Sequence, residues 1–272
     1  MSAGRGTQAD GPTAARVRAH AATTEGFWGR VRIMADIRHF KNRTEAGRLL
    51  AQRLAGHAGR PDTVVLALPR GGVPVGFAVA QRLGIALDVL LVRKLGMPGH
   101  EEFAMGAVGS GGVRVLQPGV PGLMGVTAQD VEAVTARELA ELQRRERAYR
   151  GGRPPLDLAG RSVILVDDGV ATGSTMLAAI EVARRLGPRE LVLAIPVAPP
   201  DTAAALEPRV DDLVCLSTPP HFRAVGQWYD AFEQTSDEEV QDLLATAWHD
   251  EAAAGARPTG GANHEKHDRH RL

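Results

Sequence analysis

The sequence predicts an α/β fold with three layers, in which a mostly parallel β-sheet is flanked by helices. Short apolar, β-branched runs alternate with helical patterns along the chain, which is typical of a parallel sheet covered on both faces. The composition is that of a globular protein, with 44% hydrophobic and 24% charged residues in 272. A chain of this length can bury one sizeable core. We therefore expect one domain over residues 34–250, between two tails.

The expected elements follow one another in the order strand, turn, helix. The expected strands are residues 63–68, 87–92, 162–166, 191–197 and 213–216, with short candidates around Ala107 and Val113. The expected helices are residues 43–56, 72–83, 127–150, 174–186 and 237–248. Thr127 is a candidate N-cap of its helix. Parallel sheets bind ligands at the carboxyl ends of their strands, so the site is expected in the loops that follow these strands.

Both ends of the chain are expected to be disordered tails. Residues 1–33 are rich in Gly, Ala, Arg and Thr without periodicity, and residues 251–272 are polar and glycine-rich. Met34 opens the organised sequence and is a candidate for the natural start.

Composition excludes several classes of partner. Lys and Arg number 32, as do Asp and Glu, so no overall charge favours nucleic acid. No run approaches the roughly 18 apolar residues of a membrane span, and the N-terminus lacks the apolar region of a secretory signal. The single cysteine, Cys215, excludes an internal disulfide and a cysteine-based zinc site. These features fit a cytoplasmic protein.

Residues 162–176, SVILVDDGVATGSTM, carry the most informative pattern. Asp167 and Asp168 stand where a buried strand ends, and the residues after them open a helix. A phosphate dianion needs several converging N–H donors, which a helix N-terminus supplies, and Gly173 lets the backbone approach it closely. The carboxylates cannot face a phosphate, but they suit sugar hydroxyls or a divalent cation held through water. Phosphate beside a diol describes a ribose 5-phosphate.

Two alternative roles for this segment fit it less well. The acids could merely end a strand, and a hydroxyl side chain could merely cap a helix. Neither role explains why the acids and the hydroxyls occur together in this order. A phosphoacceptor receiver domain also uses paired acids after a strand, but it does not need an anion cradle directly behind them.

The segment VILVDDGVATGST resembles the phosphoribosyl-pyrophosphate (PRPP) motif of type I phosphoribosyltransferases, and the similarity extends over residues 40–247. The resemblance implies transfer of phosphoribose from PRPP to a nitrogenous base, in nucleotide salvage, with release of pyrophosphate and with Mg²⁺ as cofactor. Asp167 and Asp168 would contact the ribose hydroxyls and hold the metal through water. The 5-phosphate would lie on Ala171, Thr172, Gly173, Ser174 and Thr175. Similar enzymes are commonly dimers, so a homodimer is expected.

Two positions depart from the family patterns. Gly169 stands where a branched apolar residue is usual, which would loosen the start of the loop. Ala171 stands where hypoxanthine-guanine enzymes carry an aspartate, so a 6-oxopurine acceptor is disfavoured.

Residues 68–76, LPRGGVPVG, follow the first core strand. Arg70 offers a fork of donors to phosphate oxygens, and Gly71-Gly72 permits a turn with exposed N–H groups. A Gly-Gly pair is often only a turn, and the spacing is not that of a dinucleotide site. By the resemblance, Arg70, Gly71 and Gly72 would bind pyrophosphate, with a cis peptide near Arg70–Gly71.

Arg93 and Lys94 are expected at the end of the second strand, where packing hardly explains two cations, although a surface strand end would. Residues 96–103 look like the family's mobile catalytic loop, which closes over the reacting centre and excludes water. We expect Arg93, Lys94, Glu101 and Glu102 to be catalytic, with His100 as a further acid/base candidate, although a solvated loop tip explains the last three as well. Residues 103–106 lack the glutamate of adenine-type enzymes, which puts adenine in doubt.

By the resemblance, residues 217–235, with help from residues 36–45, are expected to form a small hood over the acceptor. Aromatic residues are only 4% of the chain, yet several gather here. Phe222, Trp228 and Tyr229 would bind the base by stacking. A small satellite core under a loop explains them nearly as well.

Two other functions compete with the transferase. One is a non-catalytic regulatory protein that senses PRPP or nucleotide on the same fold. The other is a phosphoribosyl hydrolase or phosphatase-like enzyme. Arg93 and Lys94 favour the transferase, and the balanced charge argues against a regulator that binds nucleic acid.

Overall fold

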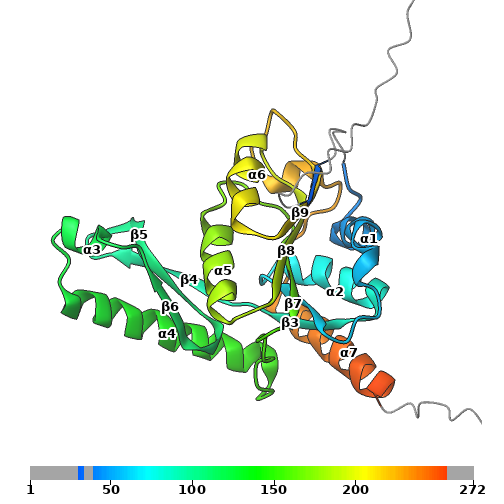
Figure 1. The fold of residues 1–272 in the computed structure, drawn as a ribbon, viewed down its shortest axis with the longest axis horizontal. Coiled ribbons are helices and arrows are strands. Elements are labelled where there is room, and N and C mark those ends of the chain that lie inside the picture. The colour runs from blue at the N-terminus through cyan, green and yellow to red at the C-terminus, as the bar shows by residue number, and fades with distance from the viewer. Residues whose placement is uncertain (1–29, 34–38, 256–272) are drawn as a thin grey trace, which may run out of the picture.

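A computed structural model describes residues 30–33 and 39–255 of the chain. Its centre is a six-stranded parallel sheet (Figure 1). The strands lie in the order β1 (Arg30–Ile33), β9 (Asp212–Ser217), β8 (Glu190–Val197), β7 (Ser162–Val166), β2 (Thr63–Ala67) and β3 (Ala86–Val89). Every residue of β2 and β7 is buried, as expected for strands covered on both faces.

Helices cover both faces of this sheet (Figure 1). Alternate residues of β2 enter two separate cores, with Val65 in one and Val64 in the other. The first core is shared with α1 (Arg43–Arg53), α2 (Gly72–Leu83) and α7 (Asp237–Gly255), and the second with α5 (Ser174–Arg185) and α6 (Pro200–Leu206). The predicted three-layer α/β fold is therefore confirmed.

A second unit, here called the arm (residues 92–150), projects from the edge of the central sheet (Figure 1). It contains an antiparallel sheet of β4 (Val92–Met97), β5 (His100–Gly109) and β6 (Val113–Leu116), the short helix α3 (Val120–Leu123), and the long helix α4 (Ala128–Arg150). Helix α4 packs on β4 and β5. The predicted cap of α4 is confirmed, because Thr127 and Asp130 form a reciprocal capping box.

The arm corrects the prediction of one strand over residues 87–92. The strand β3 ends at Val89, and β4 begins a different sheet at Val92. Between them Leu91 exchanges hydrogen bonds with Ser110 rather than with the central sheet: its N–H donates to the Ser110 hydroxyl at 3.0 Å, and its carbonyl accepts from the Ser110 N–H at 3.0 Å. Arg93 and Lys94 therefore lie near the start of β4, not at the end of a strand of the central sheet.

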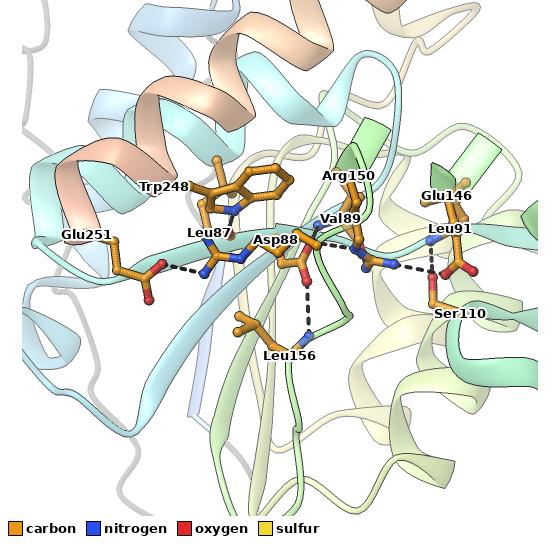
Figure 2. A network of polar contacts seen from close by, with 11 residues as sticks. Leu87, Asp88, Val89, Leu91, Ser110, Glu146, Arg150, Leu156, Trp248 and Glu251 are labelled. Carbon is orange, nitrogen blue, oxygen red and sulfur yellow. Dashed lines mark hydrogen bonds and ion pairs between the residues drawn. The ribbon is translucent and has the colours of Figure 1, made fainter. Parts of the chain in front are cut away.

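Helix α4 is fixed to the sheet edge by a buried polar network (Figure 2). Arg150 Nε donates to Asp88 Oδ1 at 3.0 Å, and both side chains are 5% exposed or less. The same guanidinium donates to the carbonyl of Val89 at 2.7 Å and to Glu146 Oε1 at 3.0 Å. The second oxygen of Asp88 accepts from the N–H of Leu156 at 3.2 Å. The C-terminal end of α4 is therefore held in one position against β3.

Both predicted tails are wrong at their inner ends. Residues 30–33 form β1, because their backbone pairs in parallel with β9. Residues 251–255 belong to α7, because three consecutive alanines sustain the helix and Glu251 pairs with Arg153 at 2.8 Å. The rest of both tails, and the candidate start Met34, lie outside the described residues. None of the helices in residues 39–255 has the length and apolar character needed to cross a membrane.

Candidate functional site

Two loops meet at the carboxyl edge of the sheet. Asp167 and Asp168 follow β7, and the turn at Gly71-Gly72 follows the neighbouring strand β2. A Cβ atom added to Gly71 would lie 2.0 Å from Asp168 Oδ2, and one added to Gly72 would lie 2.9 Å from the carbonyl oxygen of Val166. Gly71 has ordinary helical angles, φ −59° and ψ −30°. Space, not conformation, therefore requires glycine at this position.

Asp168 is held by three neighbouring groups. Arg43 Nε donates to its Oδ2 at 2.9 Å, in a pair whose side chains are 12% and 14% exposed. The Tyr229 hydroxyl donates to its backbone carbonyl at 2.6 Å, and its own N–H donates to Asp167 Oδ1 at 2.8 Å. Arg43 of α1 thus orients the carboxylate, while the hood and the first acid hold the backbone of Asp168.

The acid pair is electrostatically unfavourable on its own. Burial raises the pKa of Asp167 well above its usual range, and the charge of Asp168 raises it further. Burial also raises the pKa of Asp168, against the opposing effect of the Arg43 guanidinium. Hydroxyl donors or a cation would relieve this arrangement.

The acid pair fits a hydrated Mg²⁺ rather than a protein cage. Within the described part of the chain, no group of three or more His, Cys, Asp and Glu side chains could hold a metal. Mg²⁺ usually keeps several waters and is bound through one or two carboxylates together with substrate phosphates. Asp167 and Asp168 provide that kind of donor set.

The predicted phosphate cradle lies at the N-terminus of α5. Gly173 precedes the helix with φ +77°, a conformation that favours glycine. Thr172 and Ser174 are exposed, with their hydroxyls 3.4 Å apart. Helix α6 supports the loop, because the Thr202 hydroxyl donates to the carbonyl of Ala171 at 2.8 Å. Hydroxyl donors and a helix N-terminus are thus open to an anion.

Gly169 has a structural cause that the sequence did not reveal. Its φ is +155°, and an added Cβ would lie 2.6 Å from Cγ1 of Val225 in the hood. The branched residue usual in the family would collide there. The loop is therefore tightly packed at this point, rather than loosened as predicted.

Lys94 reaches the cradle from the arm. Its Nζ donates to the Ser174 hydroxyl at 3.1 Å. Arg93 instead donates to Glu138 of α4 at 2.5 Å. Although burial raises the pKa of Glu138, hydrogen bonds from Arg93 and Arg137 lower it overall, so this partner stays ionised. Lys94 was predicted to be catalytic, and the structure places it beside the predicted 5-phosphate cradle.

The predicted mobile loop at residues 96–103 is a β-hairpin. Met97 pairs with His100, and Gly99 makes the turn with φ +76°. Extended pairing replaces the flexible loop because the two strands continue through the polar stretch. Glu101 is exposed and lies on β5, next to the residue that follows the turn. Glu102 lies on the same strand, and its side chain is outside the described part.

Arg70, which was predicted to bind pyrophosphate, lies beside the start of α7. Its Nη1 is 3.7 Å from Asp237 Oδ1, which also accepts from the Tyr149 hydroxyl at 2.6 Å. The cis peptide lies at Pro69–Arg70, one residue before the expected place.

The hood joins the two segments expected to form it, where described. Phe40 forms a parallel bridge with Tyr229, and the N–H of Phe40 donates to the carbonyl of Trp228 at 2.9 Å. Tyr229 is 6% exposed and packs between Phe40 and Phe232, with ring centroids at 5.4 and 5.0 Å. Its position makes it a support for Asp168 rather than an open stacking surface.

Phe222 and Trp228 remain candidates for the acceptor side. Their rings stack at 6.4 Å with an angle of 26°. Trp228 is buried, and Phe222 is partly exposed. Of the three predicted aromatic residues, Phe222 is the one with a surface available to a base.

Arg43 is the functional candidate that sequence reasoning missed. Besides Asp168 it contacts the hood, since its guanidinium lies 3.9 Å from the centre of the Phe232 ring and donates to the carbonyl of Glu233 at 2.7 Å. It lies within the range expected to assist the hood, but its partners are 125 and 190 residues away. No local pattern could have identified it.

The fold and site define an α/β protein with a helix N-terminus and an acid pair at the carboxyl edge of a parallel sheet. The family model described as a phosphoribosyl transferase domain matches residues 36–232. The chain therefore belongs to the phosphoribosyl transferase domain family.

Individual relatives agree with this assignment. Two Mycobacterium tuberculosis proteins, Rv0571c and MT0597, both named "Putative phosphoribosyl transferase", are each 51% identical over 217 residues, which cover 80% of this chain and 49% of theirs. The chain thus spans about half the length of these relatives. The crystal structure of TT1426 from Thermus thermophilus has a TM-score of 0.69 and 47% identity, covering 76% of this chain and 98% of that one.

Proposed function

We propose that the protein transfers phosphoribose from PRPP to a nitrogenous base, in cytoplasmic nucleotide salvage, and releases pyrophosphate. The observation that carries the proposal is the direct contact of two loops. The turn at Gly71-Gly72 packs on Asp168, while the open N-terminus of α5 follows the same acid pair. A diol site between two anion sites matches a ribose with phosphates on both sides.

The reaction that we propose breaks the bond between C1 of the ribose and a pyrophosphate oxygen, which keeps the electron pair. A nitrogen of the base forms the new bond to C1 and loses its proton. The hydroxyls of Thr172 and Ser174, with Lys94, would bind the 5-phosphate. Asp167 and Asp168 would accept hydrogen bonds from the ribose hydroxyls, and Arg70 would stabilise the charge that develops on pyrophosphate.

We propose Mg²⁺ as the cofactor, held by Asp167 and Asp168 through water. When bound, it would neutralise part of the pyrophosphate charge. The donor chemistry of the pair, which lacks a third protein ligand among the described residues, supports a metal that arrives with the substrate.

The acceptor is proposed to lie under the hood, against Phe222. Ala171 lies at the predicted cradle and offers no side-chain acid for proton transfer, which supports an acceptor other than a 6-oxopurine. Trp228 would support the stacking ring from behind, since the two rings are parallel within 26°.

A second candidate is a protein that senses PRPP without turnover. Two observations favour it: the segment expected as a mobile catalytic loop is a paired hairpin, and Asp168 is already engaged by Arg43. Pyrophosphate release from PRPP, measured with Mg²⁺ and a panel of nucleobases, separates the two.

Release with at least one base, lost in Asp168→Asn, is the result that the transferase predicts. The matched control is Asp201→Asn, a side chain at the start of α6. If the protein binds PRPP but releases no pyrophosphate with any base, the sensor function is supported and the transferase is overturned.

A further inference from the structure

A small cavity lies between the arm and the carboxyl edge of the central sheet. Its volume is about 50 Å³. Pro69 and Thr175 line it from the sheet side, and they belong to the pyrophosphate turn and the phosphate cradle. Arg93, Arg145 and Tyr149 line it from the arm. Helix α4 therefore forms a wall of the same site that carries the two anion-binding loops.

The cavity can hold small polar groups. Its volume of about 50 Å³ is enough for ordered water, which needs polar partners, and Arg93, Arg145 and Tyr149 supply polar groups on its lining. A phosphate group placed there would meet the same donors.

Helical spacing explains which residues of α4 face the cavity. Leu142, Arg145 and Tyr149 line it and are separated by three and four residues, so they share one face of the helix. Arg147 is exposed, lies on the opposite face of α4 and is not among the lining residues.

The arginines that line the cavity form ion pairs with acidic side chains in this structure. Arg93 pairs with Glu138, and Arg145 pairs with Glu141. Tyr149 donates its hydroxyl to Asp237, the same carboxylate that lies 3.7 Å from Arg70. Arginine forks are well suited to phosphate oxygens, and an incoming dianion could exchange with these carboxylates.

The wall is held in place by the network of Figure 2. Arg150, the residue after Tyr149, is buried against Asp88 and bonded to the carbonyl of Val89. Glu146, the residue after Arg145, joins the same network. The cavity-facing groups of α4 are thus preorganised relative to the sheet edge.

We propose that Arg145 and the Tyr149 hydroxyl form, with Arg70 and Arg93, a subsite for the terminal phosphate of the pyrophosphoryl group. The inference rests on the proposed function, because it assigns the pyrophosphate end of the same site. It adds helix α4 of the arm to the groups that recognise the substrate.

The test is calorimetric binding of inorganic pyrophosphate, with Mg²⁺, to the full chain. Arg145→Gln should weaken pyrophosphate binding at least about tenfold, since it removes a charge-assisted hydrogen bond. Tyr149→Phe should weaken it by a smaller factor. The control Arg147→Gln, which removes an exposed arginine from the opposite face of α4, should stay within about twofold of the wild type. Ribose 5-phosphate affinity should be unchanged in all three variants.

The outcomes keep the two proposals apart. Wild-type pyrophosphate affinity in Arg145→Gln, or an equal loss in Arg147→Gln, would overturn the subsite. Absence of pyrophosphate binding in the wild type would overturn it too. If Arg145→Gln weakens pyrophosphate binding selectively while no base supports release from PRPP, the subsite stands and the transferase fails. An equal loss for inorganic phosphate and pyrophosphate would show a free-phosphate site and overturn the assignment to pyrophosphate.

Discussion

Replacing Gly71 by alanine isolates the contact between the two loops of the site. The backbone at Gly71 has helical angles that alanine adopts freely, so the substitution adds only a methyl group. That methyl carbon would lie 2.0 Å from Asp168 Oδ2 and 2.7 Å from its Cγ. The carboxylate must therefore withdraw from the position in which Arg43 holds it.

The size of the effect follows from the geometry. Real contacts of this type essentially never fall below 3.0 Å, so the oxygen or the turn must move by about 1 Å. Such a movement breaks the hydrogen bond of 2.9 Å to Arg43 and misplaces the acceptor for the ribose hydroxyls. Loss of one hydrogen bond to a charged group corresponds to roughly 10- to 100-fold weaker binding. A displacement of about 1 Å can cost a further factor of about 100 in turnover.

Calorimetric titration with PRPP and Mg²⁺ measures this directly. Gly56→Ala is the matched control, because an added Cβ there meets nothing within 4 Å. Thermal unfolding of both variants shows whether the fold survives. If folded Gly71→Ala binds PRPP as tightly as the wild type, the position of Asp168 does not matter for the ligand, and the reasoning from the packed loops is refuted.

Three further substitutions test other parts of the structure. Arg150→Met leaves Asp88 buried without its partner and should lower the free energy of unfolding by about 3–5 kcal/mol in urea titrations; a loss below about 1 kcal/mol would contradict a buried network. Tyr229→Phe leaves the Asp168 carbonyl without its donor and should weaken PRPP binding severalfold with the fold intact, whereas unchanged affinity would count against the support role. In Asp167→Asn, PRPP binding should fall while stability at neutral pH rises. The raised pKa of Asp167 means that the wild type loses stability as pH increases from 3.8 through the folded pKa, and the variant does not. Urea unfolding at several pH values checks this sign, and a variant less stable at pH 7 would reverse it.

The parts of the fold that could be predicted are those determined by local pattern. The strand at Ser162–Val166 is buried at every residue, so its unbroken apolar run was a reliable indicator. The helix over Gly72–Leu83 was predicted with its observed bounds. The phosphate cradle was also visible, because its acids, glycine and hydroxyls lie within nine residues of one another.

The parts that failed depend on partners distant in sequence. The apolar run at residues 87–92 looks continuous in the sequence. In the structure Leu91 hydrogen-bonds to Ser110, and the run is divided between two sheets. Residues 96–103 contain glycine and proline, yet cross-strand pairing orders them as a hairpin. Gly169 is explained by its φ of +155° together with close contacts to Val225 of the hood and Val197 of β8, both distant in sequence. Composition alone carries no information about such contacts.

The central claim is that the loop from Asp167 to Thr175 holds a ribose 5-phosphate. The most direct measurement is a crystal structure of the protein with PRPP and Mg²⁺ bound. We expect the 5-phosphate at the N-terminus of α5, within hydrogen-bond distance of the Thr172 and Ser174 hydroxyls, and the ribose hydroxyls on the acid pair. A 5-phosphate bound at the Gly71-Gly72 turn instead, or a ribose turned away from Asp167 and Asp168, would contradict the claim.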